Sequence, residues 1–294
     1  MITEIAPAPE RVAAPPARPR RKRRAWDEVP RWHIYLPLTV YLLFTLVPFY
    51  WILLFALRPA GSTSLVPWPM TFDHFEKVWN ERAFGTYFQN SVLVGLATLV
   101  MTTLVALAGG YALARFDFRV KKAFMLALLC TQFVPGALLL VPLFEIFANL
   151  RMINSLGSVV LAETVFQLPL SMILISGFIR NVPYSLEEAA WVDGCDRFTA
   201  FRIVVLPLLR PGLIAVGSFA FVHAWNHFLF ALMFLSDQGK QTIPVGLNTL
   251  MSADSVDLGA LAAGGIIAAV PVVIVFAFIQ KWLITGFSAG AVKG

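Results

Sequence analysis

Residues 183–194 have the sequence PYSLEEAAWVDG, a polar, helix-favouring stretch in a chain that is otherwise strongly apolar. Of the 294 residues, 58% are hydrophobic and 14% are charged. Soluble domains are about 45–50% apolar and about 25% charged. The composition therefore excludes a single water-soluble globule and predicts an integral membrane protein, whose few polar connections carry most of the charge.

Six apolar segments surround this stretch, and each is long enough to cross a bilayer as a helix, which takes about 20 residues. They cover residues 33–57, 90–114, 123–144, 156–179, 211–235 and 258–280. We therefore predict an all-α integral membrane protein with six transmembrane helices.

The placement of Lys and Arg predicts the orientation of these segments. If the N-terminus lies inside, 18 of the 23 Lys and Arg residues fall in cytoplasmic segments. Positive charge is enriched on the cytoplasmic side of membrane proteins. We therefore expect both termini in the cytoplasm and no nucleic-acid partner, because topology accounts for the net charge of +6.

Three further regions give expectations from composition. Residues 1–31 carry the basic run Arg20–Arg24 and several prolines, which predicts a disordered cytoplasmic tail that either anchors the topology or binds anionic lipid or nucleic acid. The aromatic-rich loop 58–87 is either a membrane belt or a docking face. Cys130 and Cys195 are expected to stay reduced.

The loop 180–210 is the longest predicted cytoplasmic connection between spans. Ser185 followed by Glu188 is the spacing of a capping box, which predicts the start of a helix. Gly194 is then expected to end this helix in a left-handed conformation.

A second short helix is expected after this turn. Asp196 is placed to cap it, and the sequence Leu206-Pro207 is expected to end it, because the residue before proline disfavours helix. A helix as short as 185–193 is poorly stable alone. We interpret the pair as a helix–turn–helix that docks into a groove of a partner.

These residues carry a family resemblance. Glu188-Ala189-Ala190, then Gly194 after three residues, then Leu206-Pro207 resembles the EAA motif of ABC-importer permeases. Residues 133–136, 141–144, 166–169, 225–226 and 286–294 resemble the carbohydrate branch, the maltose-type second permease subunit. The resemblance covers residues 33–294, with a homologous core over about 88–282.

The resemblance implies a fold, partners and a mechanism. The fold is the type I ABC importer transmembrane domain, over residues 32–294, in a bacterial inner membrane. The partners are a second homologous permease, two ATPase subunits, an extracellular solute-binding protein and membrane lipid. ATP-driven closure of the ATPases would switch the permeases from inward-facing to outward-facing. The residues implied to couple the loop to the ATPase are Glu187, Glu188, Ala189, Ala190, Asp193, Gly194, Leu206 and Pro207.

Polar residues within the spans are candidates for the pore. Glu163 lies in the fourth span, and Gln167 follows one turn later on the same face. An ionisable residue in a bilayer faces a cavity or a partner. We expect that Glu163 and Gln167 either line the pore and contact sugar hydroxyls or that Glu163 makes a structural hydrogen bond; Asn226 is either a pore residue or a helix-packing residue.

Other chemistries are less consistent with the sequence. His223 and His227 have a metal-like spacing but lack the glutamate of an HExxH motif and a third ligand. No phosphate-binding loop occurs, so we expect no cofactor, no metal and no enzymatic activity in this chain. The alternatives to a sugar importer subunit are an importer of glycerol phosphate or a polyol, and a stand-alone secondary transporter.

Overall fold

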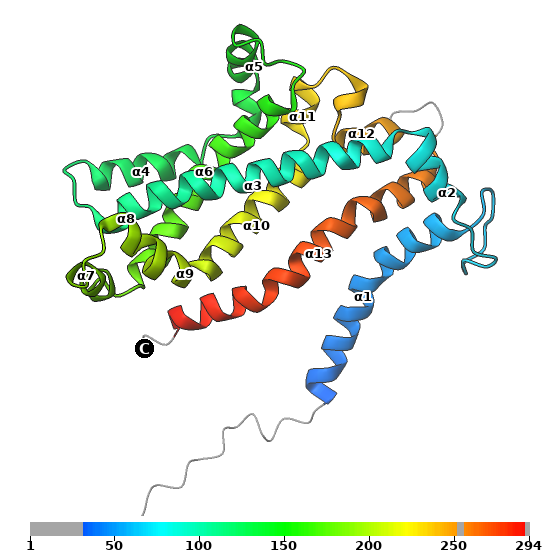
Figure 1. Cartoon of the computed structure of the whole chain (residues 1–294). Helices are drawn as coiled ribbons and strands as arrows, with labels where there is room; N and C mark the ends of the chain where they lie inside the picture. Colours follow the sequence, from blue (N-terminus) through cyan, green and yellow to red (C-terminus); the bar gives the residue numbers. More distant parts are fainter. Residues whose placement is uncertain (1–31, 252–255, 292–294) are drawn as a thin grey trace, which may run out of the picture. The chain divides into compact units, whose positions relative to one another are not determined.

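The computed structural model describes residues 32–251 and 256–291, with side chains as far as Lys281. Every regular element in these ranges is a helix (Figure 1). The predicted all-α fold is therefore confirmed. The predicted basic tail, residues 1–31, lies outside the described residues.

The chain divides into two units after Phe49. The described part of the first unit is the beginning of α1 (Trp32–Leu57), whose large apolar side chains are exposed, as a bilayer requires. The second unit begins at Tyr50 and contains all the other helices.

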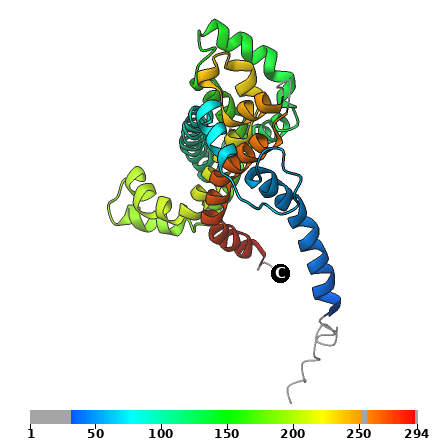
Figure 2. The ribbon, with the colours of Figure 1, turned by 90° about the vertical axis from the view of Figure 1, so that its right-hand side faces the viewer.

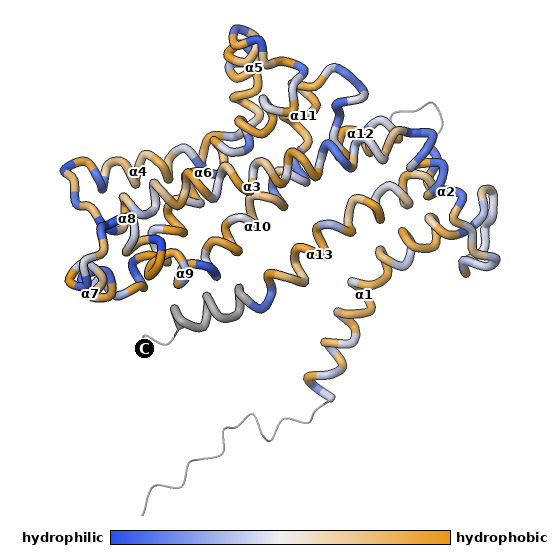
Figure 3. The backbone as a smooth tube through the Cα atoms, viewed as in Figure 1, coloured by the Kyte–Doolittle hydropathy of each residue, from blue (hydrophilic) through white to orange (hydrophobic). Residues whose placement is uncertain are grey.

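Four helices are long and apolar enough to span a membrane: α1, α3 (Phe84–Arg115), α6 (Leu156–Arg180) and α13 (Leu258–Ala291). Two bent pairs raise the number to six if each pair is one span. One pair is α4 (Lys121–Thr131) with residues Gly136–Asn149, bent by 95°, and the other is residues Arg197–Leu208 with α10 (Arg210–Asn226), bent by 74°. Apolar residues follow the course of these helices in Figure 3.

The prediction of one helix over residues 123–144 is wrong. α4 ends at Thr131, a short 3-10 turn covers Gly136–Leu139, and α5 (Leu140–Asn149) continues in a new direction. Pro135 lies at the bend, with an extended backbone. Proline has no N–H to continue a helix and disfavours helix in the residue before it, so the sequence itself contains the reason for the break.

The prediction of one span over residues 211–235 is also wrong. α10 ends at Asn226, His227 has an extended backbone with ψ of 123°, and α11 (Leu229–Phe234) is a separate short helix. The last long helix, α13, extends beyond the predicted end at residue 280.

The interior of the second unit is formed by α3, α6 and α10, with α13 packed against α10 (Figure 1). Three buried apolar clusters lie along these contacts; they centre on Phe230 and Phe234, on Phe84 and Trp225, and on Ile175 and Ile179. α12 (Ile243–Met251) packs against α13 and α3. The connection between α6 and α10 contains α7 (Ser185–Val192), α8 (Arg197–Ala200) and α9 (Leu206–Leu208), and it projects from these helices in Figure 2.

An ion pair joins α2 (Asp73–Glu76) and the π-helical turn Lys77–Glu81 to the start of α13. The Lys77 ammonium is 2.9 Å from Asp257 Oδ2. Burial raises the pKa of Asp257, but hydrogen bonds from the Ala260 N–H and from Lys77 outweigh burial and hold this pKa below its ordinary value. The carboxylate is therefore charged and fixes the first turn of α13.

A glycine allows a close approach of α3 to α6. A Cβ at Gly110 would lie 2.7 Å from Ile175 Cγ2 and 3.1 Å from the backbone nitrogen of Ser176. Small residues let membrane helices approach until their backbones touch. The α3–α6 contact therefore depends on the missing side chain at this position.

We expect Gly110→Ala to lower the stability of the assembled protein by about 1–3 kcal/mol, because the added methyl group overpacks a rigid backbone contact. The matched control is Gly177→Ala on α6, where a Cβ would meet nothing within 4 Å; it should be neutral or stabilising. Thermal melting in detergent measures both, and equal melting temperatures for the two variants would contradict the assignment.

Candidate functional site

The predicted helix–turn–helix is present, and its turn has the expected geometry. α7 ends at Val192, and Gly194 follows in the left-handed region with φ of +89°. The Cys195 N–H donates to the Ala190 carbonyl at 2.9 Å, and the Gly194 N–H donates to the Trp191 carbonyl at 3.0 Å. This is a Schellman motif, so the predicted role of Gly194 in the turn is confirmed.

The start of α7 differs from the prediction. Its N-cap is Tyr184, and no side chain caps it, so the capping box predicted from Ser185 and Glu188 is wrong. Instead, the N–H groups of Leu186 and Glu187 donate to the carbonyls of Pro183 and Tyr184. The backbone turn before α7 satisfies donors that the serine side chain was expected to satisfy.

A buried ion pair holds α7 against the end of α3. The Glu187 carboxylate is fully buried and accepts hydrogen bonds from Arg115 Nε at 2.6 Å and from the Tyr111 hydroxyl at 2.7 Å. Arg115 Nη2 also donates to the Val182 carbonyl at 2.9 Å. Glu187 is therefore a positioning residue inside this chain, and its carboxylate is not presented to a partner.

The outward face of α7 and the turn after it combine charged, small and apolar side chains. Glu188, Ala189, Val192 and Asp193 are exposed, whereas Ala190 is buried with Glu187. The Val192 side chain, with 88% of its surface exposed, is the most accessible large hydrophobic group of this helix. Of the predicted coupling residues, the structure thus presents Glu188, Ala189, Asp193 and Gly194 outward and turns Glu187 and Ala190 inward.

The second helix of the motif starts as predicted but ends differently. Asp196 Oδ1 accepts from the Thr199 N–H at 3.2 Å, and hydrogen bonds from Thr199 lower the pKa of Asp196. The expectation that Leu206-Pro207 ends this helix is wrong: a π-helical turn over Phe201–Val205 continues directly into α9, which contains Leu206 and Pro207. Proline is tolerated there because it lies in the first turn of α9, where an N–H has no helical partner.

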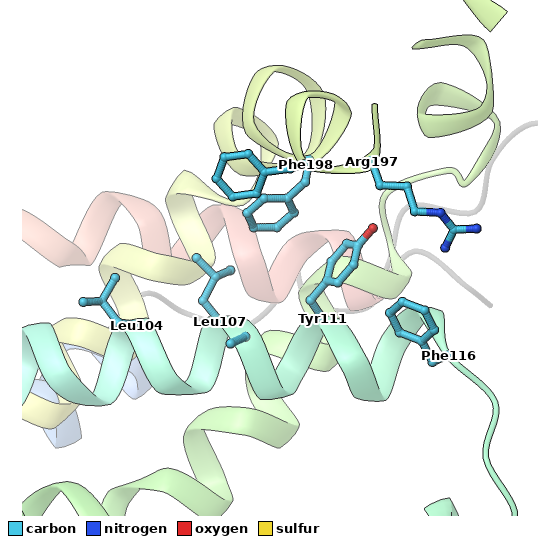
Figure 4. A pocket seen from close by; sticks show the side chains of 8 residues that line it. Leu104, Leu107, Tyr111, Phe116, Arg197 and Phe198 are labelled. Carbon is cyan, nitrogen blue, oxygen red and sulfur yellow. The ribbon is translucent and has the colours of Figure 1, made fainter. Parts of the chain in front are cut away.

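An apolar pocket of about 430 Å³ separates the rest of this loop from α3 (Figure 4). Leu104, Leu107 and Tyr111 of α3 line one side, and Phe198 and Arg197 of α8 line the other. The Tyr111 ring meets Phe201 edge-on, with ring centroids 5.0 Å apart. The loop therefore contacts α3 at Tyr111 and Arg115, and the pocket lies beside this contact.

The second polar site is a cluster of three side chains between α6 and the end of α10. Glu163 is fully buried; His223 Nδ1 is 3.0 Å from its Oε2, and His227 Nδ1 is 2.6 Å from its Oε1. The two imidazole rings stack, with centroids 5.3 Å apart. This cluster was not predicted from the sequence, in which Glu163 and the two histidines are far apart.

Gln167 and Asn226, the other predicted pore residues, lie outside the Glu163 cluster. Gln167 is half-buried one turn along α6 from Glu163. Asn226 is exposed, and its Nδ2 donates to the Val222 carbonyl of its own helix at 2.9 Å rather than to another helix. Asn226 lines a small pocket with Gly265 and Ala268 of α13.

In the described part of the chain, no group of three or more His, Cys, Asp or Glu side chains is arranged to hold a metal ion. Both oxygens of Glu163 face imidazole nitrogens, so the buried carboxylate has polar partners within the protein.

Comparison with protein families identifies the architecture. Residues 105–288 match the family described as binding-protein-dependent transport system inner membrane component. The chain belongs to this family.

Three relatives of this permease are named as carbohydrate transport subunits. The diacetylchitobiose uptake system permease protein of Streptomyces coelicolor is 34% identical, over 84% of this chain and 91% of the relative. The trehalose transport system permease protein of Mycobacterium tuberculosis is 31% identical over 85% and 93%. The melibiose/raffinose/stachyose import permease protein of Bacillus subtilis is 32% identical over 84% and 91%.

Solved structures share the fold of the permease. A bacterial ABC transporter involved in import of the acidic polysaccharide alginate contains a chain that superposes with a TM-score of 0.74, at 19% identity, over 88% of this chain and 98% of that one. A structure of an alginate transporter with an alginate pentasaccharide-bound periplasmic protein gives a TM-score of 0.65 at 15% identity, over 88% and 96%. The predicted ABC importer transmembrane fold is confirmed.

Family membership settles the class and location of the protein. It is a multi-pass protein of the bacterial inner membrane and a permease subunit, a transport component rather than an enzyme. The matched region contains both the α7–α9 loop and the Glu163 cluster.

We expect Glu187→Leu alone, or Arg115→Met alone, to destabilise the permease by about 3–5 kcal/mol, because each leaves an unpaired buried charge. The double variant should recover most of this loss, since apolar side chains replace both charges. Thermal melting of the four proteins gives the coupling energy. Glu145→Gln on α5, which changes an exposed carboxylate, is the control; additive losses in the double variant would contradict the pairing.

Proposed function

We propose that this permease forms half of the translocation path of an ATP-driven sugar importer and receives the force of ATP binding through α7. The observation that carries the proposal is the geometry of the loop: α7 presents Glu188 and Ala189 outward, while Arg115 fixes its inward face through Glu187. A short helix that is fixed on one side and exposed on the other suits insertion into a groove of a separate subunit.

The proposed partners follow from the family and from this face. They are a second homologous permease, two ATPase subunits, a periplasmic solute-binding protein and the lipid around the spans. ATP hydrolysis belongs to the ATPase subunits. The proposed domain division is a basic tail over residues 1–31 and a membrane domain over 32–294, with its homologous core at about 88–282 and its coupling loop at 180–210.

The force path is proposed to run from α7 into α3. Closure of the ATPases moves α7, and the Arg115–Glu187 ion pair at 2.6 Å transmits the movement to the end of α3. Because α3 packs along α6 and α10, a rigid-body rotation of these three helices switches the translocation path from inward-facing to outward-facing.

The proposed substrate is a sugar or an oligosaccharide. The support is the named function of the three relatives, which belong to transport systems for diacetylchitobiose, for trehalose, and for melibiose, raffinose and stachyose. Glycerol phosphate or a polyol is the second candidate. Within the path, Gln167 and Asn226 are proposed to meet substrate hydroxyls, because both are polar and neither is fully buried.

The substrate class is tested with the complete importer, reconstituted in liposomes with its ATPases and binding protein. Radiolabelled trehalose, raffinose, diacetylchitobiose and glycerol 3-phosphate are supplied outside, with ATP inside. We expect ATP-dependent uptake of at least one of the sugars and no uptake of glycerol 3-phosphate. Uptake by this chain alone would overturn the importer assignment in favour of a secondary transporter.

The coupling role of α7 is tested with Ala189→Phe, which fills the proposed contact face. We expect binding-protein-stimulated ATP hydrolysis to fall about tenfold, the effect of about 1.4 kcal/mol at the interface. Ala148→Phe, at an exposed alanine of α5, is the matched control. Normal stimulation in the Ala189 variant would show that another surface receives the ATPase.

A further inference from the structure

The end of α10 presents a polar stripe that packing leaves open. α10 is flanked by α3, α6 and α13, which bury most of its surface. The residues left exposed in its second half are Phe219, His223 and Asn226, at positions i, i+4 and i+7 of one helix face. The stripe thus becomes polar towards the end of the helix.

A polar stripe of this kind is unfavourable against lipid. Ionisable and amide side chains within a span face a water-filled cavity or pair with other polar groups. The side chain of His223 is 42% exposed even though its Nδ1 is already engaged by Glu163. The exposed surface therefore belongs to the side chain of a ring whose Nδ1 is engaged and whose Nε2 has no hydrogen-bond partner among the described residues.

Glu163 and His227 fix this orientation. Glu163 is fully buried, and its two oxygens are 3.0 Å and 2.6 Å from the two imidazoles. A buried carboxylate is stable only when it is paired in this way. The paired carboxylate selects a His223 ring with its proton on Nδ1, which leaves Nε2 as an acceptor, or as a donor when the imidazole is charged.

The surroundings of Asn226 provide room beside the stripe. A pocket of about 320 Å³ lies between Asn226 and α13, and its α13 side is lined by small or branched residues, Gly265, Ala268, Ala269, Val272 and Val273. Small side chains here let a hydroxyl-rich solute approach Asn226 without displacing protein.

We propose that His223 and Asn226 are solute-contacting residues of the translocation path, and that Glu163 and His227 are positioning residues that hold the Nε2 edge of His223 towards passing hydroxyl groups. The proposal rests on the proposed function for the chemistry of the solute, a carbohydrate. It differs from the sequence-based expectation because it moves the contact from Glu163 to His223.

The exposure of the stripe to water is tested without any substrate. Cys130 and Cys195 are replaced by Ser, and single cysteines are placed at His223, Asn226 and, as a control, Leu93 of α3, an apolar position with 57% of its surface exposed. The assembled importer is treated with a charged methanethiosulfonate reagent, with and without ATP, and labelling is read by mass. Only a water-exposed thiol ionises and reacts.

We expect labelling of His223→Cys and Asn226→Cys in at least one of the two states, and none of Leu93→Cys. If both stripe cysteines are as unreactive as the control in both states, the proposal is overturned, whether or not any sugar is transported. Should His223→Cys fail to assemble, Asn226→Cys decides, because its wild-type side chain bonds only to its own helix.

The positioning role is tested by transport per ATP hydrolysed, using whichever of trehalose, raffinose or diacetylchitobiose the importer carries. We expect His223→Leu to lower this ratio about tenfold, the effect of one lost hydrogen bond to a polar group. His223→Gln, which keeps a donor and an acceptor, should retain most of the wild-type ratio. The ratio for Glu163→Gln should lie between those of His223→Leu and His223→Gln. Equal ratios for Leu and Gln at position 223 would show that the residue only supports the fold.

Discussion

A buried carboxylate in a membrane domain requires a partner inside the protein, and this constraint shapes both polar sites of the permease. Glu187 accepts hydrogen bonds from Arg115 and Tyr111, and Glu163 pairs with His223 and His227. Removing either carboxylate from water without a partner would cost several kcal/mol. Each pairing therefore fixes how two segments distant in the sequence meet.

The two polar sites lie at different positions along the packed helices α3, α6 and α10. The Glu187 pair joins the α7–α9 loop to the end of α3, and the Glu163 cluster joins α6 to the end of α10, while α3 packs along both α6 and α10. In the proposed mechanism, a movement applied to α7 reaches the helices that carry the polar stripe through close helix–helix contacts such as that of Gly110 with Ile175 and Ser176. Packed helices transmit such movements as rigid bodies.

The break in the predicted span over residues 211–235 is linked to the Glu163 cluster. α10 ends at Asn226, and His227 is extended, which turns its imidazole towards Glu163. In a continuous helix over residues 211–235, the backbone at His227 would instead continue along the axis of α10. Irregular backbone within a membrane domain is tolerated where protein or a water-filled cavity satisfies it. The break therefore coincides with the polar cluster rather than with a lipid-facing surface.

The sequence by itself determined the membrane class, the six apolar segments, the Gly194 turn, the Asp196 cap and the family, because hydropathy, local backbone preference and a long spaced motif are properties of neighbouring residues. It did not determine that Glu187 faces inward, that Pro207 lies within a helix, or that Glu163 pairs with two histidines about 60 residues away. Those features depend on which helices pack together, and on the demand that every buried charge find a partner there. Only the tertiary structure decides that.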